Sequence, residues 1–473
     1  MTNLSRSVSD GHESMTNLAA ALDALRQLLG DRFTTGESTR AIHGRDESWH
    51  APRLPDAVVF PNDTAEVSAI ARICHQHRVP MIPFGAGSSV EGALIPVRGG
   101  VAVSTANLNQ LLEVNPGNFD CVAQPGLLRR SLNEQIRHTG LFFSVDPGAD
   151  ASVGGMAATR ASGTNTVRYG TMADAVRGLE VVLADGQIIR TGSHARKSSA
   201  GYDLTHLFIG SEGTLGFITK LILRLYPRPE HIISATCTFP DVNSAVECSV
   251  AIMQSGIPIA RLEFLDEVMI DAVNQYSKLS LPLKPHLFFE FHGSPGQTTE
   301  VLDTVRELAT DFNGQDFYSA TAQEERDRLW RARHDCAYAC MAYERPKRMM
   351  TTDVCVPLDD LADNINAVRA DAQAAGITAP VLGHVGDGNF HTVLLIDPND
   401  VEAVKKAEGV HRRLVERAIN CGGTCTGEHG VGLGKREFMG LEHGNALGVM
   451  QSIKKALDPY GLMNPGKVLP DLV

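Results

Sequence analysis

Pro147-Gly-Ala-Asp-Ala-Ser-Val-Gly-Gly-Met-Ala-Ala158, followed shortly by Ser162-Gly-Thr-Asn165, is the segment that says most about the fold. It combines four glycines with many Ala, Ser and Thr residues and almost no bulky side chains. Small residues allow close packing of helices or loops, which is a purely structural explanation. So many small polar residues together favour a loop that wraps a large, flat cofactor, because glycine lets the backbone approach a ligand closely.

Two further segments have the same character. Pro83-Phe-Gly-Ala-Gly-Ser-Ser89 ends the predicted strand 79–84, and Gly210-Ser-Glu-Gly-Thr-Leu-Gly-Phe-Ile218 precedes the predicted strand 219–225. Successive free backbone N–H groups in such loops can hold a phosphate, although a plain turn explains the first segment equally well. The first segment is not a Rossmann fingerprint, because Ser88-Ser-Val90 stands where the third glycine should fall.

The order of predicted strands and helices indicates more than one α+β unit. A chain of 473 residues is long enough for about two to three domains. Strands and helices alternate up to about Pro227, with a hairpin turn at Asp185-Gly186. A second β-α-β rhythm begins near Ile232 and includes one long helix predicted over 324–343. This second pattern is similar to a duplicated ferredoxin-like unit.

Bulk composition excludes some partners and suggests a location. The net charge of −12 and the pI near 5.8 disfavour binding to nucleic acid. No apolar stretch is long enough to span a bilayer, and the polar first fourteen residues lack the apolar core of a signal peptide. Nine scattered cysteines indicate free thiols in a reducing cytosol. We therefore predict a cytoplasmic protein, with peripheral attachment to the inner membrane left open.

Gly383-His-Val-Gly-Asp-Gly-Asn-Phe-His-Thr392 places two histidines around a turn. Apolar residues flank Gly386-Asp-Gly-Asn389, whose composition is typical of a turn. A hairpin with that loop would pair His384 with His391, and directly opposed residues share one face, with Cβ atoms about 4.5–5.5 Å apart. Two imidazoles so placed can share a divalent ion. A polar surface pair is the alternative.

Gly422-Gly-Thr-Cys-Thr-Gly-Glu-His-Gly430 adds a carboxylate in a glycine-rich loop. Two histidines and one carboxylate form a common catalytic metal set that leaves positions open for substrate. We therefore predict that His384, His391 and Glu428 bind one divalent ion, either zinc or manganese. The alternative is that Glu428 and His429 only cap the loop.

The motifs together resemble a known family. The three glycine-rich segments and Asn464-Pro-Gly-Lys467 resemble the FAD-binding domain of the vanillyl-alcohol-oxidase and p-cresol-methylhydroxylase (PCMH) superfamily. The HxGDGNxH and GEHG motifs are similar to the C-terminal half of the FAD-linked D-2-hydroxyacid dehydrogenases. Including Glu263-Phe-Leu-Asp266 and Asp353-Val-Cys-Val-Pro357, the pattern from about residue 40 onward is most similar to the mitochondrial-type D-lactate dehydrogenases.

The resemblance implies an α+β fold with a PCMH-type, two-subdomain FAD-binding domain and a ferredoxin-like substrate (cap) domain. The implied divisions are a flexible N-terminal tail (1–17), the FAD domain (18–228), the cap with the metal-binding hairpin (229–420) and a C-terminal segment that returns to the FAD domain (421–473). FAD would lie extended, with its pyrophosphate at the first two loops and its ring system near the third. Ser88 stands where some relatives attach FAD through a histidine, so non-covalent FAD is expected. The implied cofactor-binding residues are Gly85, Ala86, Gly87, Ser88, Ser89, Pro147, Gly148, Ser152, Gly155, Ala158, Ser162, Gly163, Thr164, Glu212, Gly213, Ile218 and Asn464.

The resemblance also assigns chemistry to the second half. It makes His429 the acid–base residue beside the metal ligands, and it turns Arg333, in Leu329-Trp-Arg-Ala-Arg-His334, toward the site to bind the substrate carboxylate. A guanidinium suits a carboxylate because it can form a bidentate pair of hydrogen bonds with it. The alternative is that Arg333 is a solvent-exposed charge on the helix surface. Thr351 stands where relatives acting on D-2-hydroxyglutarate carry a basic residue, which favours a monocarboxylate.

We therefore expect FAD-dependent oxidation of a small D-2-hydroxy acid, with D-lactate converted to pyruvate. The metal would lower the hydroxyl pKa, His429 would take the proton, and a hydride would pass to the flavin. The alternatives are D-2-hydroxyglutarate, glycolate or a larger apolar D-2-hydroxy acid as substrate, an oxidase that reduces oxygen, and a metal-dependent hydrolase or lyase without flavin. The electron acceptor stays open between cytochrome c, a quinone and an electron-transfer flavoprotein, and a homodimer is also open.

Overall fold

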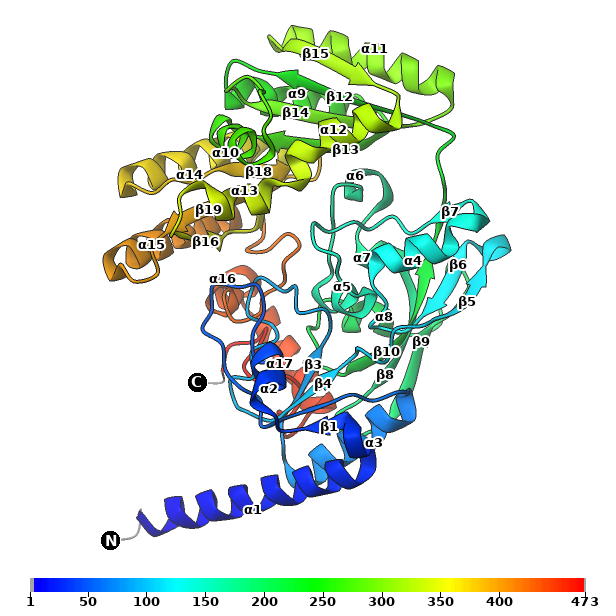
Figure 1. Ribbon diagram of the computed structural model, residues 1–473, viewed down its shortest axis with the longest axis vertical. Helices are drawn as coiled ribbons and strands as arrows, with labels where there is room; N and C mark the ends of the chain where they lie inside the picture. Colours follow the sequence, from blue (N-terminus) through cyan, green and yellow to red (C-terminus); the bar gives the residue numbers. More distant parts are fainter. Residues whose placement is uncertain (1–3, 472–473) are drawn as a thin grey trace.

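The computed structural model describes residues 4–471, and they form two parts with separate β-sheets (Figure 1). The N-terminal part contains the three glycine-rich segments. The second part begins at β12 and lies at the top of Figure 1, and the chain returns to the first part after α15. Two of the contacts of this returning segment are a parallel bridge between Met463 and Met81 and a hydrogen bond from Asn464 Nδ2 to the Ala93 carbonyl, 3.0 Å long.

The first sheet has a parallel core. Its spatial order is β1 (Phe33–Thr34), β2 (Ala57–Val59), β4 (Val101–Ser104) and β3 (Met81–Phe84), with β4 parallel to both β2 and β3. Every residue of β2 and β4 is buried, as expected for parallel strands covered on both faces. The associated helices are α1 (Leu4–Leu29), α2 (Glu37–Ile42) and α3 (Thr64–His77).

The second sheet of the N-terminal part is antiparallel. Its order is β5 (Leu111–Asn115), β6 (Asp120–Ala123), β10 (Phe217–Arg224), β8 (Val176–Val182) and β9 (Ile188–Gly192). The hairpin between β8 and β9 contains the Asp185-Gly186 turn predicted from the sequence. A separate short pair joins β7 (Leu141–Phe142) to β11 (Tyr226–Pro227). The helices of this region are α4 (Arg129–Ile136), α5 (Val153–Thr159), α6 (Thr166–Tyr169), α7 (Met172–Ala175) and α8 (Leu204–Phe208).

The second part contains one complete ferredoxin-like unit and a second, related unit that has no fourth strand among the described residues. In the first unit the order is β15 (Gln315–Ala320), β12 (His231–Thr238), β14 (His286–Gly293) and β13 (Ile259–Leu265), which is the 4-1-3-2 order of a β-α-β-β-α-β unit. The second unit continues the sheet through β18 (Val381–His384) and β19 (Asn389–Ile396) to β16 (Arg348–Thr351) and β17 (Val354–Cys355). The helices are α9 (Val242–Gln254), α10 (Glu267–Ser277), α11 (Pro295–Asp311), α14 (Leu361–Ala375) and α15 (Val401–Asn420), and they are followed by α16 (Met439–His443) and α17 (Ala446–Leu457) in the returning segment. The expected α+β class is thus confirmed.

Two predicted elements differ from the structure. The single helix predicted over 324–343 is two helices, α12 (Gln323–His334) and α13 (Cys336–Tyr343), because the chain turns at Asp335, whose carboxylate accepts a 2.6 Å hydrogen bond from Ser277 Oγ. The backbone of residues 4–17, which we assigned to a tail, belongs to α1. Polar residues dominate that segment, so it lacks the periodic spacing of apolar residues from which a helix can be predicted.

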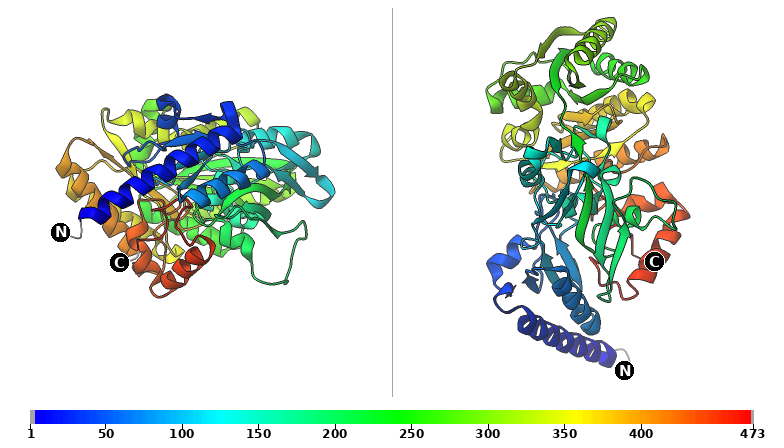
Figure 2. Two further views of the ribbon diagram at one scale, coloured as in Figure 1. Left: turned by 90° about the horizontal axis from the view of Figure 1, so that it is seen from below. Right: turned by 90° about the vertical axis from the view of Figure 1, so that its right-hand side faces the viewer.

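Arg261 on β13 connects the two parts. Its Nε donates to Asn165 Oδ1 at 3.0 Å and its Nη2 to Asp146 Oδ2 at 3.3 Å, both in the N-terminal part. Within its own sheet Arg261 Nε lies 3.5 Å from Glu290 Oε1. This largely buried network is one of the contacts that hold the second part against the first, and the two parts lie one above the other in the right-hand view of Figure 2. In residues 4–471, no helix has the length and apolar character needed to cross a membrane.

The glycine-rich segment at α5 packs too closely for a side chain. The amide of Gly154 donates to the Pro125 carbonyl at 2.8 Å, and a Cβ at Gly154 would lie 2.3 Å from Pro125 Cβ. Such a distance cannot occur without movement of the backbone.

Replacing Gly154 with Ala is therefore expected to lower the free energy of unfolding by about 1–3 kcal/mol, the usual cost of overpacking. Thermal unfolding followed by circular dichroism measures this change. Gly296→Ala on α11 is the control, because a Cβ there meets nothing within 4 Å. Equal melting temperatures for Gly154→Ala and the unchanged protein would contradict the packing argument.

Candidate active site

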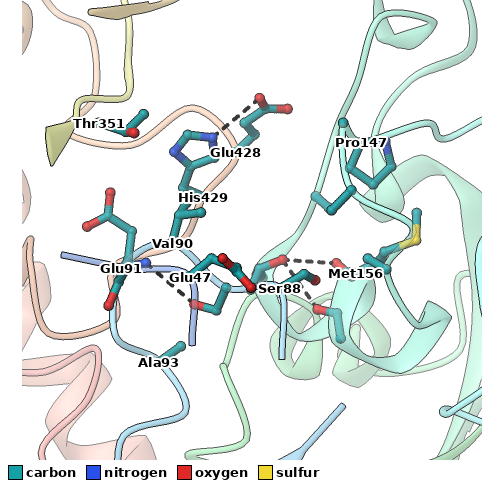
Figure 3. Close-up of a pocket in the computed structure, with 18 of the residues that line it drawn as sticks. Glu47, Ser88, Val90, Glu91, Ala93, Pro147, Met156, Thr351, Glu428 and His429 are labelled. Carbon is teal, nitrogen blue, oxygen red and sulfur yellow. Dashed lines mark hydrogen bonds and ion pairs between the residues drawn. The ribbon is translucent and has the colours of Figure 1, made fainter. Parts of the chain in front are cut away.

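A cavity of about 1580 Å³ lies where the two parts meet, and all three glycine-rich segments contribute to its wall. The second part adds Arg333, His384 and His391 to the wall, and the returning segment adds Glu428 and His429. Figure 3 shows Glu428 and His429 on one side of this cavity and Pro147 and Met156 on the other.

Most of the predicted cofactor residues line this cavity. They are Gly85, Ala86, Gly87, Ser88, Ser89, Pro147, Gly148, Ser152, Gly155, Ala158, Thr164, Glu212, Gly213 and Ile218. Ser162, Gly163 and Asn464 lie outside the wall. Ser162 Oγ instead donates to Glu428 Oε2 at 2.5 Å, Gly163 packs against the backbone of Asp146, and Asn464 Nδ2 donates to the carbonyls of Ala93 and Glu212.

The glycines bring the three segments into contact. A Cβ at Gly85 would lie 2.6 Å from Ser152 Oγ, and a Cβ at Gly213, whose φ is +70°, would lie 2.7 Å from Pro83 Cγ. The segments therefore pack through their backbones and present small residues to the cavity. This wall fits a large planar cofactor that carries phosphates.

The histidine hairpin forms with a register different from the one we predicted. His384 is opposite Asn389, and His391 is opposite Leu382, so the predicted pairing of the two histidines is wrong. The loop is residues 385–388, where Gly388 adopts φ +78° against the Val356 carbonyl. A shift of two residues keeps both histidines on the same face of the sheet, and their ring centroids are 5.7 Å apart.

Glu428 completes the predicted ligand set. Its Oε1 lies 3.3 Å from His384 Nε2 and 3.2 Å from His391 Nε2. One ligand atom from each residue falls within 4.8 Å of the others. Two imidazole nitrogens and a carboxylate oxygen suit zinc or manganese, so these residues could hold one divalent ion.

Asp353 holds the Glu428 loop in place and was missed by sequence reasoning. Its Oδ2 accepts hydrogen bonds from the backbone N of Glu428 and His429, at 2.9 and 3.0 Å, and from Thr426 Oγ1 at 2.7 Å. Its side chain is completely buried, and Lys435 Nζ lies 3.9 Å away. Because hydrogen-bond donors surround the Asp353 side chain, it is bound in its ionised, carboxylate form. An acidic residue directly before the apolar run Val354-Cys-Val356 was the available signal.

His429 stacks on His391, with ring centroids 4.8 Å apart and planes 12° apart. Its Nδ1 is buried and has no partner among the described residues, and its Nε2 lies 3.7 Å from Glu428 Oε1 (Figure 3). Burial lowers the pKa of His429 to about 4, against a smaller opposing effect of Asp353. The neutral imidazole therefore has a lone pair that can accept a proton beside the predicted ion site.

Arg333 is connected to the predicted ion ligand His384 by the carboxylate of Glu263. Arg333 Nε donates to Glu263 Oε2 at 2.7 Å, and Glu263 Oε1 accepts from His384 Nδ1 at 2.6 Å. Burial alone would raise the pKa of Glu263, but His384 and Arg333 outweigh it and keep the pKa below its usual value. The solvated position considered for Arg333 is excluded, since its side chain is only 12% exposed.

Comparison with known families agrees with this geometry. Residues 55–192 match a family model described as an FAD binding domain, and residues 228–468 match one described as FAD linked oxidases, C-terminal domain. The chain belongs to the FAD-linked oxidase family. The resemblance stated from the motifs is confirmed, and the protein is an FAD-dependent oxidoreductase, which excludes a hydrolase or lyase without flavin.

Curated relatives cover nearly the whole chain. A Danio rerio protein named "Probable D-lactate dehydrogenase, mitochondrial" is 51% identical over 95% of this chain and 91% of its own length. An Arabidopsis thaliana protein named "D-lactate dehydrogenase [cytochrome], mitochondrial" is 43% identical over 95% of this chain and 80% of its own length. Since both are named as mitochondrial, the cytoplasmic location that we predicted is wrong.

A solved structure shares the fold at low identity. p-Cresol methylhydroxylase with bound substrate superposes with a TM-score of 0.79 over 96% of each chain at 17% identity. This likeness concerns the fold alone, and it agrees with the two-part architecture described above.

Replacing Asp353 with Asn is expected to destabilise the protein by about 1–3 kcal/mol, because an amide donor would then face the donors that the carboxylate now satisfies. Buried Lys435 would also lose one of its two carboxylate neighbours and keep only Glu91, whose Oε1 lies 3.2 Å from Lys435 Nζ. Chemical denaturation measures this loss. Asp359→Asn, at an exposed position of the same segment, should stay within about 0.5 kcal/mol of the unchanged protein. Equal stability of the two variants would refute the anchoring role of Asp353.

Proposed function

We propose that this protein oxidises D-lactate to pyruvate and that a cytochrome takes the electrons. The observation that carries the proposal is the position of the Glu428 carboxylate within 3.3 Å of two imidazole nitrogens, in the same cavity as the Arg333 guanidinium. The names of the Danio rerio and Arabidopsis thaliana relatives support D-lactate, and the second also supports a cytochrome as acceptor.

The cavity residues fit both FAD and a divalent ion. FAD, when bound, would supply a hydride acceptor for C2 of the substrate, and a divalent ion would supply positive charge beside the hydroxyl oxygen. FAD would contact the glycine-rich segments without a covalent bond, since the first segment has Ser88 and no histidine. His384, His391 and Glu428 would hold the ion, which we take to be zinc or manganese.

Arg333 would bind the substrate carboxylate. Its Nε is occupied by Glu263, and its guanidinium makes no other hydrogen bond to the described residues. The two Nη groups are therefore left for a ligand in the cavity that Arg333 lines. Two parallel N–H donors match the two oxygens of a carboxylate, which orients as well as binds it.

His429 would take the hydroxyl proton. It borders the ion ligands, it lines the cavity, and its Nδ1 has no partner among the described residues. Stacking on His391 holds the ring plane, so the base does not need to reorganise when the substrate arrives. Thr351, also in the cavity wall, adds no charge, which suits a monocarboxylate.

Anaerobic mixing of the FAD-loaded protein with D-lactate is expected to bleach the flavin absorbance, and L-lactate is expected to leave it unchanged. The inverted centre of L-lactate cannot place both its hydroxyl and its carboxylate on these groups with hydrogen toward the flavin. Glycolate and D-2-hydroxyglutarate, the alternatives from the sequence analysis, are the comparison substrates. Glycolate is of added interest because a Bacillus subtilis relative at 33% identity is named "Glycolate oxidase subunit GlcD". Faster bleaching by either of them than by D-lactate would overturn the proposed substrate.

Replacing His429 with Asn is expected to reduce kcat by about 10²–10⁴-fold, the usual contribution of a general base, while FAD stays bound. His443→Asn is a matched control, because His443 Nε2 also lies beside the carboxylate of the preceding glutamate, 3.8 Å from Glu442 Oε1, outside the cavity wall. Steady-state kinetics with D-lactate compare the two variants. Full turnover by the His429→Asn protein would remove this residue from the mechanism.

A further inference from the structure

Glu263 is a charged residue in the interior of the second sheet. It lies on β13 opposite Phe288, and its side chain is only 1% exposed. Its two oxygens have different partners: His384 Nδ1 for Oε1 and Arg333 Nε for Oε2. Neither of those residues is close to Glu263 in sequence. One buried carboxylate therefore touches both the predicted ion site and the predicted carboxylate-binding site.

The contact with His384 determines which imidazole nitrogen can bind an ion. An imidazole whose Nδ1–H donates to a carboxylate has its lone pair on Nε2. In this structure Nε2 is the nitrogen that lies 3.3 Å from Glu428 Oε1, within the ligand set. Glu263 thus fixes the ring in the tautomer and orientation that ion binding requires.

The contact with Arg333 determines which edge of the guanidinium can bind substrate. Because Nε is bonded to Glu263 at 2.7 Å, the edge formed by Nε and one Nη is occupied. Only the end that carries the two Nη groups remains for a carboxylate, and this fixes its direction of approach.

We propose that Glu263 is a positioning residue that couples the two sites, by holding His384 and Arg333 at a fixed separation so that one substrate molecule can reach the ion and the guanidinium together. This inference rests on the function proposed above. It predicts that a single change at Glu263 weakens two properties, the affinity for the ion in the absence of substrate and the KM for D-lactate.

Glu290 offers a matched comparison within the same sheet. It is also buried, and it also bonds a histidine and approaches an arginine, with His292 Nε2 at 2.8 Å and Arg261 Nε at 3.5 Å. His292 is not part of the ion ligand set. A purely structural role for a buried carboxylate should therefore affect Glu263 and Glu290 variants in the same way.

The test compares Glu263→Gln with Glu290→Gln in the FAD-loaded protein. Mn²⁺ affinity is measured without substrate by electron paramagnetic resonance of free Mn²⁺, and KM and kcat are measured with D-lactate. A glutamine can accept from His384 or Arg333, but its NH₂ group then faces the other donor. We expect Glu263→Gln to weaken Mn²⁺ binding about 10- to 100-fold and to raise KM roughly 10-fold, as expected for one lost charged hydrogen bond. Glu290→Gln should keep the Mn²⁺ affinity of the unchanged protein.

Three results would overturn the coupling: unchanged Mn²⁺ affinity in Glu263→Gln, an unchanged KM in that variant, or equal losses in Glu290→Gln. Should Glu263→Gln not retain FAD, Glu263→Asp replaces it, because aspartate keeps the charge but is too short to reach both partners, and the same two losses are expected. Failure of D-lactate to reduce the flavin of the unchanged protein would refute the proposed substrate. The Mn²⁺ measurement needs no substrate and would still decide the role of Glu263.

Discussion

The hydrogen bonds between the Asp353 carboxylate and the loop of Glu428 and His429 are the interaction that allows an ion site to form. Glu428 and His429 belong to a glycine-rich loop that has no regular secondary structure of its own, and such a loop has many accessible conformations. Asp353 selects one of them by accepting from both backbone amides, while Lys435 Nζ donates to the Asp353 carbonyl at 2.7 Å. At the far end of the loop, Glu212 accepts from the amide of Val431 at 2.7 Å. The loop is thus tied to both parts of the molecule.

The site lies at a boundary, and its chemistry is divided accordingly. The N-terminal part supplies small residues and free backbone for the cofactor. The second part supplies Arg333, His384 and His391, and the returning segment supplies Glu428 and His429. Charges of this kind are costly to bury unless each is paired, and here each has a partner: Glu263 with Arg333 and His384, and Asp353 with Lys435. Arg261 joins the two parts through hydrogen bonds to Asp146 and Asn165.

The parts that sequence predicts are those whose signal is local. Runs of glycine and small residues mark the cofactor segments, and HxGDGNxH marks the hairpin without revealing its register, since a loop of residues 385–388 and one of 386–389 have similar composition. Both registers leave His384 and His391 on one face of the sheet, so the predicted ligand set does not depend on which register forms. Glu263 and Asp353 were quoted only as parts of motifs, because their roles depend on partners far away in the chain. Turns that accompany tertiary contacts, such as the one at Asp335, do not alter the periodic pattern of apolar residues and so cannot be predicted from it.

The location of a bound ion tests this account most directly. A crystal of the FAD-loaded protein soaked in Mn²⁺, measured at the manganese absorption edge, gives an anomalous difference map that identifies the ion by element. We expect one strong peak bonded to His384 Nε2, His391 Nε2 and a Glu428 carboxylate oxygen, at about 2.0–2.2 Å as for other first-row metals with such ligands. A map without a peak there, or with its peak on Asp353, His391 and His429 instead, would contradict it.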